Sequence, residues 1–238
     1  MSDPSPSLDP KAVEPEGALM ATSMESRPRL GEGLYSFGEA ARLLAREDRV
    51  IDAHKLHRWA ASALTFGRRD LGGGAAGLSF HDLVSLELVA RFRQEGVSLQ
   101  RVHRLEVELR RRYPEVERPL AYDVFFTDGS SVWAGEAIGG DLIEVVGTKP
   151  GHYVWTDAIA SFATEVDFSE SGGARRWRPA PGIELDPARQ QGRPVVARTR
   201  VPVASVVSAL TEGSVAEVAD WFGLTTEQVD DAAAFGRR

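Results

Sequence analysis

The last quarter of the chain limits the fold most, because it predicts three short helices that each carry their own start and stop signals. The first helix runs from about Val203 to Thr211, after a strand-like segment. The other two begin with capping boxes, in which a Ser or Thr precedes a Glu or Gln by three residues. The capping pairs are Ser214 with Glu217 and Thr225 with Gln228, and the closing glycines are Gly213, Gly223 and Gly236. Three such helices are the minimum for a helix-turn-helix and favour a small interaction domain over a catalytic pocket.

Length and composition predict two or three small domains, since 238 residues with 42% apolar content can bury only modest cores. The chain has no cysteine, which excludes disulfides, thiolate zinc sites and cysteine nucleophiles and suits a reducing cytoplasm. No apolar run approaches the roughly 20 residues of a membrane span, and the first residues do not resemble a signal peptide. We expect a soluble, cytoplasmic protein without a membrane partner.

Charge is unevenly distributed along the chain, although its net value is −7. Residues 34–118 carry 15 basic and 12 acidic side chains and form the only positive block. A phosphate-binding surface is therefore expected there, although a folded domain with charges of both signs is an equally good interpretation.

The sequence divides into four parts. Residues 1–33 hold five of the 13 prolines and few large apolar residues, which predicts a disordered arm. Residues 34–120 have helical periodicity, residues 121–180 are a β-rich middle region and linker, and residues 181–238 contain the three capped helices. The expected fold class is α+β and mainly helical.

Two helices open the second part. Ser36 with Glu39 forms a capping box for the first, and Asp52 caps the second. Periodicity places Leu56, Trp59, Ala60 and Ala63 on the inner face of this second helix. The side chains expected on its outer face are His54, Lys55 and Arg58. A short helix, a turn and a polar-faced helix are the outline of a helix-turn-helix.

Arg68 and Arg69 follow, beside a glycine-rich tip, as in a two-stranded wing that holds the DNA backbone. A phosphate-cradling loop is a weak alternative, because no Lys-Ser or Lys-Thr pair closes the tip. Two more helices are predicted, from Ser79 to Arg93 and from Ser98 to Tyr113. The second of these has an apolar stripe of Leu99, Val102, Leu105 and Leu109. The run of arginines at 110–112 in its last turn is read as a solvated helix end in preference to a DNA contact.

The segment from Tyr35 to Tyr113 resembles the MerR-type winged helix-turn-helix, on YSFGEAARLL, KLHRWAASAL and LSFHDLVSLELVARFRQEGVSLQRV. The C-terminal segment is similar to a small trihelical antitoxin domain, on GRPVVARTRVPV and GSVAEVADWFGL. In the order of the two parts, roughly residues 34 to 238 resemble VapB-type antitoxins. Between the two lies a link, FSESGGARRWRPAPGIELDPARQQGRPVV. In the C-terminal signature, Ala197, followed by Arg198, stands where a glycine is expected before Thr199, which puts its tight turn in doubt.

The middle region, from Asp123 to Trp177, predicts a small β-meander with one short helix near Trp155 to Ala163. Its acids lie mostly at turns, where Asp is favoured locally, so a metal-dependent nuclease is disfavoured. These acids are Asp123, Asp128, Asp141, Glu144 and Asp157. His54 and His57 are three residues apart, but no third metal ligand accompanies them. We expect no enzyme, metal site or cofactor.

The resemblance implies an antitoxin with two partners, operator DNA and a PIN-like ribonuclease toxin. DNA contacts are assigned to the outer helix face and the wing. A homodimer is expected, with its interface at the stripe of Leu99, Val102, Leu105 and Leu109. The same stripe is equally well interpreted as part of the core. Toxin contacts are assigned to arginines that form bidentate pairs with carboxylates. They are Arg193, Arg198, Arg200, Arg237 and Arg238. The alternatives are a single-component MerR-like regulator with a ligand-sensing C-terminal region and an interaction scaffold that does not bind DNA.

Overall fold

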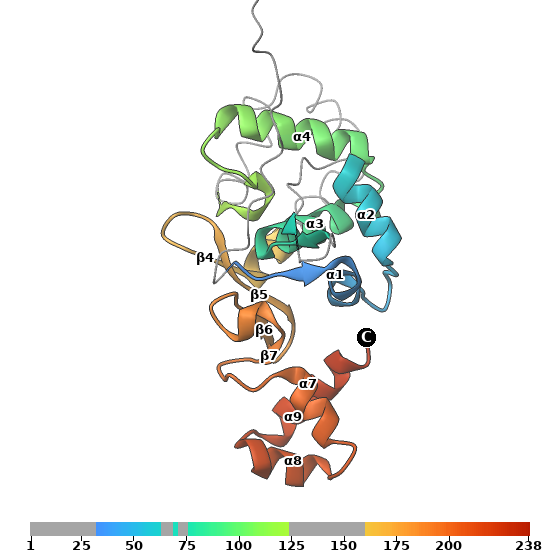
Figure 1. The fold of residues 1–238 in the computed structure, drawn as a ribbon, viewed down its shortest axis with the longest axis vertical. Helices are drawn as coiled ribbons and strands as arrows, with labels where there is room; N and C mark the ends of the chain where they lie inside the picture. Colours follow the sequence, from blue (N-terminus) through green and yellow to red (C-terminus); the bar gives the residue numbers. More distant parts are fainter. Residues whose placement is uncertain (1–31, 63–68, 71–75, 124–159) are drawn as a thin grey trace, which may run out of the picture.

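A computed structural model of the chain describes residues 32–62, 69–70, 76–123 and 160–238. The fold is α+β, with helices and two small sheets (Figure 1). Most of the predicted arm, Ala63, Arg68, the glycine-rich tip and most of the predicted meander lie outside the described residues.

The N-terminal unit consists of four helices, one 3-10 turn and a three-stranded antiparallel sheet in the order β1-β3-β2. Two capping boxes predicted from the sequence are confirmed, Ser36 with Glu39 and Ser79 with Asp82. The elements are β1 (Tyr35–Ser36), α1 (Phe37–Leu44), α2 (Ala53–Ser62), β2 (Arg69–Asp70), β3 (Ala76–Leu78), α3 (Phe80–Gln94), α4 (Leu99–Arg112) and η1 (Pro119–Ala121).

A second sheet follows, antiparallel and ordered β4-β5-β6-β7. Its strands are β4 (Val166–Phe168), β5 (Ala174–Ala180), β6 (Ile183–Leu185) and β7 (Val195–Val196), preceded by a helical segment at 160–165. The segment predicted to be a link therefore forms strands. Gly182 turns the chain between β5 and β6 with a φ of 67°, so the sheet continues across residue 180, where the sequence suggested a boundary.

The chain ends in a trihelical unit of α7 (Val203–Ala209), α8 (Val215–Phe222) and α9 (Thr226–Gly236), preceded by the 3-10 turn η4 (Gln190–Gly192). Both predicted capping boxes are confirmed, and Gly223 ends α8 in the left-handed conformation, with a φ of 64°. One detail differs, because α9 includes Gly236 and has its C-cap at Arg237. A cap paired with a glycine stop therefore locates α8, whereas α7 begins without a side-chain cap and α9 continues through its glycine.

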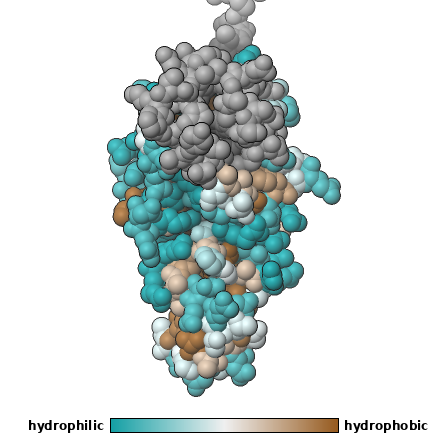
Figure 2. Space-filling view, turned by 180° about the vertical axis from the view of Figure 1, so that it is seen from behind, coloured by the Kyte–Doolittle hydropathy of each residue, from teal (hydrophilic) through white to brown (hydrophobic). Residues whose placement is uncertain are grey.

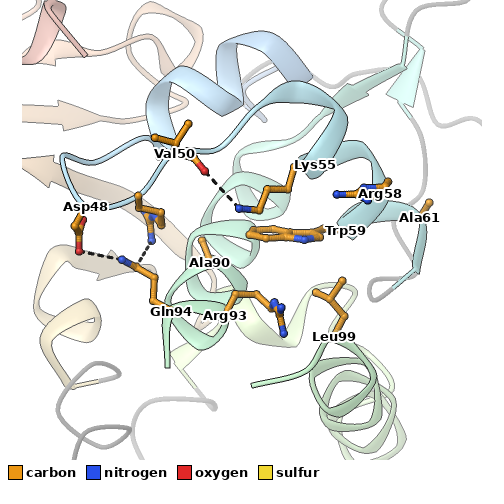
Figure 3. A pocket seen from close by; sticks show the side chains of 11 residues that line it. Asp48, Val50, Lys55, Arg58, Trp59, Ala61, Ala90, Arg93, Gln94 and Leu99 are labelled. Atoms are coloured by element: carbon orange, nitrogen blue, oxygen red, sulfur yellow. Dashed lines mark hydrogen bonds between the residues drawn. The ribbon is translucent and has the colours of Figure 1, made fainter. Parts of the chain in front are cut away.

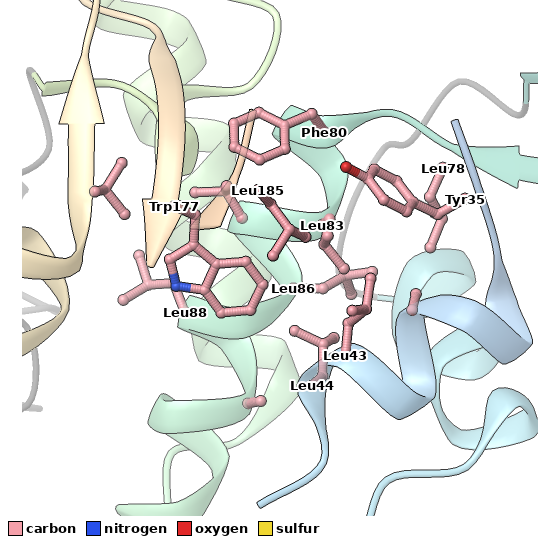
Figure 4. Close-up of a cluster of buried hydrophobic side chains, with 14 of the residues drawn as sticks. Tyr35, Leu43, Leu44, Leu78, Phe80, Leu83, Leu86, Leu88, Trp177 and Leu185 are labelled. Atoms are coloured by element: carbon pink, nitrogen blue, oxygen red, sulfur yellow. The ribbon is translucent and has the colours of Figure 1, made fainter. Parts of the chain in front are cut away.

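The second sheet packs against α3, the central helix of the core (Figure 4). Trp177 of β5 and Leu185 of β6 are fully buried in the same cluster as Leu83 and Leu86 of α3. A single core thus joins the N-terminal unit to the second sheet.

The apolar stripe on α4 belongs to this core. Val102, Leu105 and Leu109 are at most 2% exposed, and Leu99 packs against the cluster. The expected homodimer seam is therefore wrong for these side chains, because they are already buried within one chain. Their burial fits the alternative interpretation of the stripe as part of the core.

A buried ion-pair network surrounds Glu87 in the middle of α3. Its carboxylate pairs with Arg49 and with Arg91, whose Nε lies 2.9 Å from Oε1. Arg91 also pairs at 2.7 Å with Glu165, which accepts a 3.4 Å hydrogen bond from the indole N–H of Trp177. The network therefore connects the α1–α2 loop, α3 and the second sheet.

Candidate functional site

The outer face of α2 is the best candidate for a binding surface in the N-terminal unit. The helix begins at Asp52, whose carboxylate accepts a 2.6 Å hydrogen bond from the backbone N–H of Lys55. Leu56 and Trp59 are at most 5% exposed. His54 and Arg58 are exposed, as predicted, and Lys55 is half-buried. Burial of one face of α2 thus orients a polar face toward solvent.

A basic pocket of about 780 Å³ opens beside this face (Figure 3). Lys55 and Arg58 line it from α2, and Arg93 lines it from the end of α3. The ammonium of Lys55 lies 5.2 Å from the ring centroid of Trp59 and donates a 3.4 Å hydrogen bond to the carbonyl of Val50. The aromatic ring and the carbonyl both hold the ammonium in place.

Other contacts fix the rim of this pocket. The Asp48 carboxylate accepts a 3.0 Å hydrogen bond from the side-chain amide of Gln94, and Gln94 accepts one of 3.2 Å from Arg49. Arg93 donates a 2.5 Å hydrogen bond to the carbonyl of Val97. Asp48 is the only acidic residue among the described residues that line the pocket, and against Arg49, Lys55, Arg58 and Arg93 it leaves this lining net positive and suited to an anion. Sequence reasoning did not select Arg93, which it placed only as the last residue of the helix predicted from Ser79 to Arg93.

The wing residues are only partly described. Arg69 lies in β2 and pairs with Gly77 of β3, so the chain returns antiparallel after α2. Its side chain and all of Arg68 lie outside the described residues. β2 and β3 thus pair antiparallel at this place in the chain, and the contacts of the two arginines stay a prediction.

The five arginines assigned to the toxin are all exposed. They divide into two groups. Arg193 and Arg238 line a cleft between α1 and the trihelical unit, together with Arg42, which sequence reasoning did not select. The remaining three, Arg198, Arg200 and Arg237, do not line that cleft.

The turn before Thr199 forms without a glycine, contrary to expectation. Arg198 adopts the left-handed conformation with a φ of 64°. The Thr199 N–H donates a 3.0 Å hydrogen bond to the carbonyl of Val196, and its hydroxyl accepts one of 3.0 Å from the N–H of Val201. Arg198, directly before Thr199, thus occupies the position for which the signature has glycine, and Ala197 does not.

Candidate catalytic and metal-binding residues are few in the part of the chain that the structure describes. No group of three or more His, Asp or Glu side chains is arranged to hold a metal ion there. His57 is exposed and its ring centroid lies 5.1 Å from that of Phe37. Of the five acids singled out in the predicted middle region, only Asp123 is described, and its N–H donates to the carbonyl of Gly172. The helices that are described include none long and apolar enough to cross a membrane.

Two comparisons with known proteins gave matches, one for the C-terminal segment and one for the fold. Residues 183–235, from β6 to the end of α9, match a family model described as "Protein of unknown function (DUF433)". The fold is similar to the crystal structure of Rv2018 from Mycobacterium tuberculosis, with a TM-score of 0.66 and 24% identity. That likeness covers 83% of this chain and 96% of Rv2018. No curated protein matches the chain. At this identity the structural likeness shows the fold alone.

Proposed function

We propose that the chain is an antitoxin of a type II toxin–antitoxin pair. It binds operator DNA through α2 and neutralises a PIN-like ribonuclease through its C-terminal arginines. The observation that carries the DNA half is the exposed polar face of α2 beside the basic pocket of Lys55, Arg58 and Arg93. The succession of a strand, two short helices and a strand pair before α3 supports a winged helix-turn-helix of the MerR type.

The DNA contacts belong to α2 and not to the trihelical unit, because the two differ in charge. Residues 201–236 contain six acidic residues and no Lys, Arg or His. A surface without cations cannot displace the counterions that surround DNA phosphates. On α2, by contrast, His54 and Arg58 are exposed and Lys55 is half-buried, which supports their assignment to base edges and phosphates.

The toxin half depends on the resemblance of the C-terminal segment to antitoxin domains and on the exposure of its arginines. A PIN-like ribonuclease binds its metal through clustered carboxylates. An arginine that enters such a site can form bidentate pairs and replace the metal. Arg237 and Arg238, at the end of α9, and Arg198 and Arg200, after β7, are exposed and therefore accessible to such a partner.

The DNA half is tested by fluorescence anisotropy with a duplex from upstream of the protein's own reading frame. The Arg58→Gln variant should bind about tenfold more weakly than the unmodified chain, since a specific contact contributes about 1–3 kcal/mol. Arg101→Gln, an exposed arginine on α4, is the charge-matched control and should change little. Affinity should also fall steeply with salt. If both variants lose the same affinity for the duplex, the interaction is a non-specific electrostatic attraction.

The toxin half is tested separately by co-expression with the product of the neighbouring gene. Size-exclusion chromatography should show a stable complex, and the complex should cleave RNA more slowly than the free ribonuclease. Absence of a complex would contradict the proposed toxin partner and favour a single-component regulator. Failure of both experiments would leave an interaction scaffold.

A further inference from the structure

A second cleft, of about 770 Å³, lies between α1 and the trihelical unit. Its walls come from segments far apart in the sequence, and Figure 1 shows the end of the chain returning to the neighbourhood of α1. The lining side chains used below are Glu39, Arg42 and Leu43 of α1, Arg193 directly after η4, Val203, Val207 and Ser208 of α7, Phe235 of α9, and Arg238 two residues after α9.

Three arginines from separate elements line this cleft, Arg42, Arg193 and Arg238. All three are exposed, and no hydrogen bond or ion pair joins their guanidinium groups to another described residue. The guanidinium of Arg238 lies 4.9 Å from the ring centroid of Phe235, which orients it. The cleft therefore presents guanidinium groups that lack a carboxylate partner within the described part of the chain.

Glu39 is the only acidic residue among the lining residues and is already engaged. Its Oε2 accepts 2.8 Å hydrogen bonds from the N–H and the hydroxyl of Ser36. Burial opposes ionisation of Glu39, but these bonds and the charges of Arg193 and Arg42 lower its pKa below the ordinary value. One side-chain carboxylate against three guanidinium groups leaves an excess of two positive side-chain charges among the described lining residues.

The remaining lining side chains are either apolar or neutral and polar, and the polar ones are Tyr35, Gln190, Gln191, Ser205, Ser208 and Thr211. Leu43, Val203, Val207 and Phe235 line the cleft between the arginines. Gly236 lets α9 approach α7 closely, because a Cβ added there would lie 2.5 Å from a methyl group of Val207. A cavity of this size, mostly apolar with a few convergent charges, is typical of small-molecule sites.

We propose that this cleft binds a small amphipathic organic anion. The acidic head group, a carboxylate, sulfonate or phosphate ester, contacts the guanidinium groups of Arg42, Arg193 and Arg238, and the apolar body lies against Leu43, Val207 and Phe235. Charge-assisted bonds to a planar guanidinium favour these head groups. The proposal does not rest on DNA or toxin binding, and it gives Arg193 and Arg238 a ligand within the chain's own cleft, so Arg238 is shared with the proposed toxin contacts.

The experiment uses two fluorescent probes of nearly equal shape. One is 8-anilino-1-naphthalenesulfonate, and the other is N-phenyl-1-naphthylamine, which lacks the sulfonate. The full chain should bind the anionic probe saturably with one site. Arg42→Gln, Arg193→Gln and Arg238→Gln should each weaken that binding about tenfold, the loss of one bond to a charged group. Each variant should leave the binding of the neutral probe within twofold.

Two controls separate the cleft from the rest of the surface. Arg200→Gln removes an exposed arginine outside the cleft and should leave the anionic probe unaffected. Ser208→Phe places a ring at an exposed lining position and should block both probes. Near-ultraviolet circular dichroism checks that every variant is folded.

Several results would overturn the proposal. One is that the full chain does not bind the anionic probe saturably, and another is that it binds the two probes with equal affinity. A third is that Arg200→Gln and Arg193→Gln weaken binding of the anionic probe equally. Displacement of the anionic probe by a decaglutamate peptide at lower concentration than by octanoate would assign the cleft to an acidic protein segment instead.

Discussion

The hydroxyl of Tyr35 donates a 2.8 Å hydrogen bond to the carbonyl oxygen of Gly192, across 157 residues of sequence. Tyr35 lies in β1, at the start of the N-terminal unit, and Gly192 ends the 3-10 turn before β7. Gly192 has a φ of 83°, and a Cβ added there would lie 2.2 Å from the Tyr35 hydroxyl oxygen. Glycine is therefore required at this position both for its conformation and for its lack of a side chain.

The two requirements at Gly192 can be separated. Gly192→Ala should lower the free energy of unfolding by about 1–2 kcal/mol for the left-handed conformation, with a further loss for the collision with Tyr35. In a chain that also carries Tyr35→Phe, the hydroxyl is absent and the second loss should shrink. A double-mutant cycle by urea unfolding measures this coupling. Strictly additive losses would show that the alanine does not press on Tyr35.

Arg198 and Gly223 offer the reverse comparison, since both adopt left-handed backbone with φ values of 64°. Arg198→Gly should raise the free energy of unfolding by up to about 1 kcal/mol, because relief of strain exceeds the added freedom of the unfolded chain. Gly223→Ala should lower it by about 1 kcal/mol, and conformation alone is responsible, because a Cβ there meets nothing within 4 Å. Thermal unfolding of the two variants should give shifts of opposite sign. A loss on Arg198→Gly would mean that its side chain stabilises the fold.

Glu87 should be among the most sensitive positions in the core. It is fully buried, and Glu87→Gln would leave Arg49 and Arg91 without their shared carboxylate. Breaking a buried ion pair from one side costs about 3–5 kcal/mol. Glu95→Gln, at the exposed C-cap of the same helix, is the matched control and should change the free energy of unfolding by less than about 0.5 kcal/mol. Similar urea midpoints for both variants would contradict the role given to Glu87.

We expect that the trihelical unit makes no contact with DNA when the full chain binds the upstream duplex. Figure 2 shows apolar patches on this end of the molecule, where Trp221 is 55% exposed. Substituting Trp221→Ala should therefore leave affinity for the upstream duplex unchanged within twofold, whereas Arg58→Gln weakens it. Anisotropy titrations of both variants at one salt concentration make the comparison. Weaker DNA binding by Trp221→Ala would place this unit in the DNA interface despite its negative charge.

Local signals predicted local structure well in this chain. The caps at Ser36, Ser79, Ser214 and Thr225 are readable from sequence because each is satisfied within four residues. The second sheet was missed in the segment read as a link. Its strand β5, ARRWRPA, is rich in arginine, and these charges pair with acids that the folded sheet brings beside them, such as Asp167 of β4 with Arg178.

The candidate site was predictable only in part, for the same reason. Periodicity on α2 separated exposed His54 and Arg58 from buried Trp59, because all three lie on one helix. Arg93 of the basic pocket and Arg42 of the second cleft come from other elements, and no spacing in the sequence relates them to their neighbours. Glu87 did leave a signal, as the only acidic residue within the apolar run of α3, LVSLELVARF.

His81 makes stability depend on pH in a direction that the structure fixes. Burial lowers its pKa below the ordinary value of 6.5, and its Nε2 lies 3.0 Å from the carbonyl oxygen of Ala174, so the neutral ring donates that bond. The folded chain thus binds fewer protons at His81 than the unfolded chain. This contribution to stability is complete above pH 6.5 and is lost as pH falls below it toward the lowered pKa.

His81→Gln keeps an N–H donor without titrating, so its free energy of unfolding should fall less between pH 7.5 and pH 5.5. His54→Gln, on the exposed face of α2, should keep the pH dependence of the unmodified chain. Parallel curves for His81→Gln and the unmodified chain in urea titrations would assign the acid sensitivity to other groups.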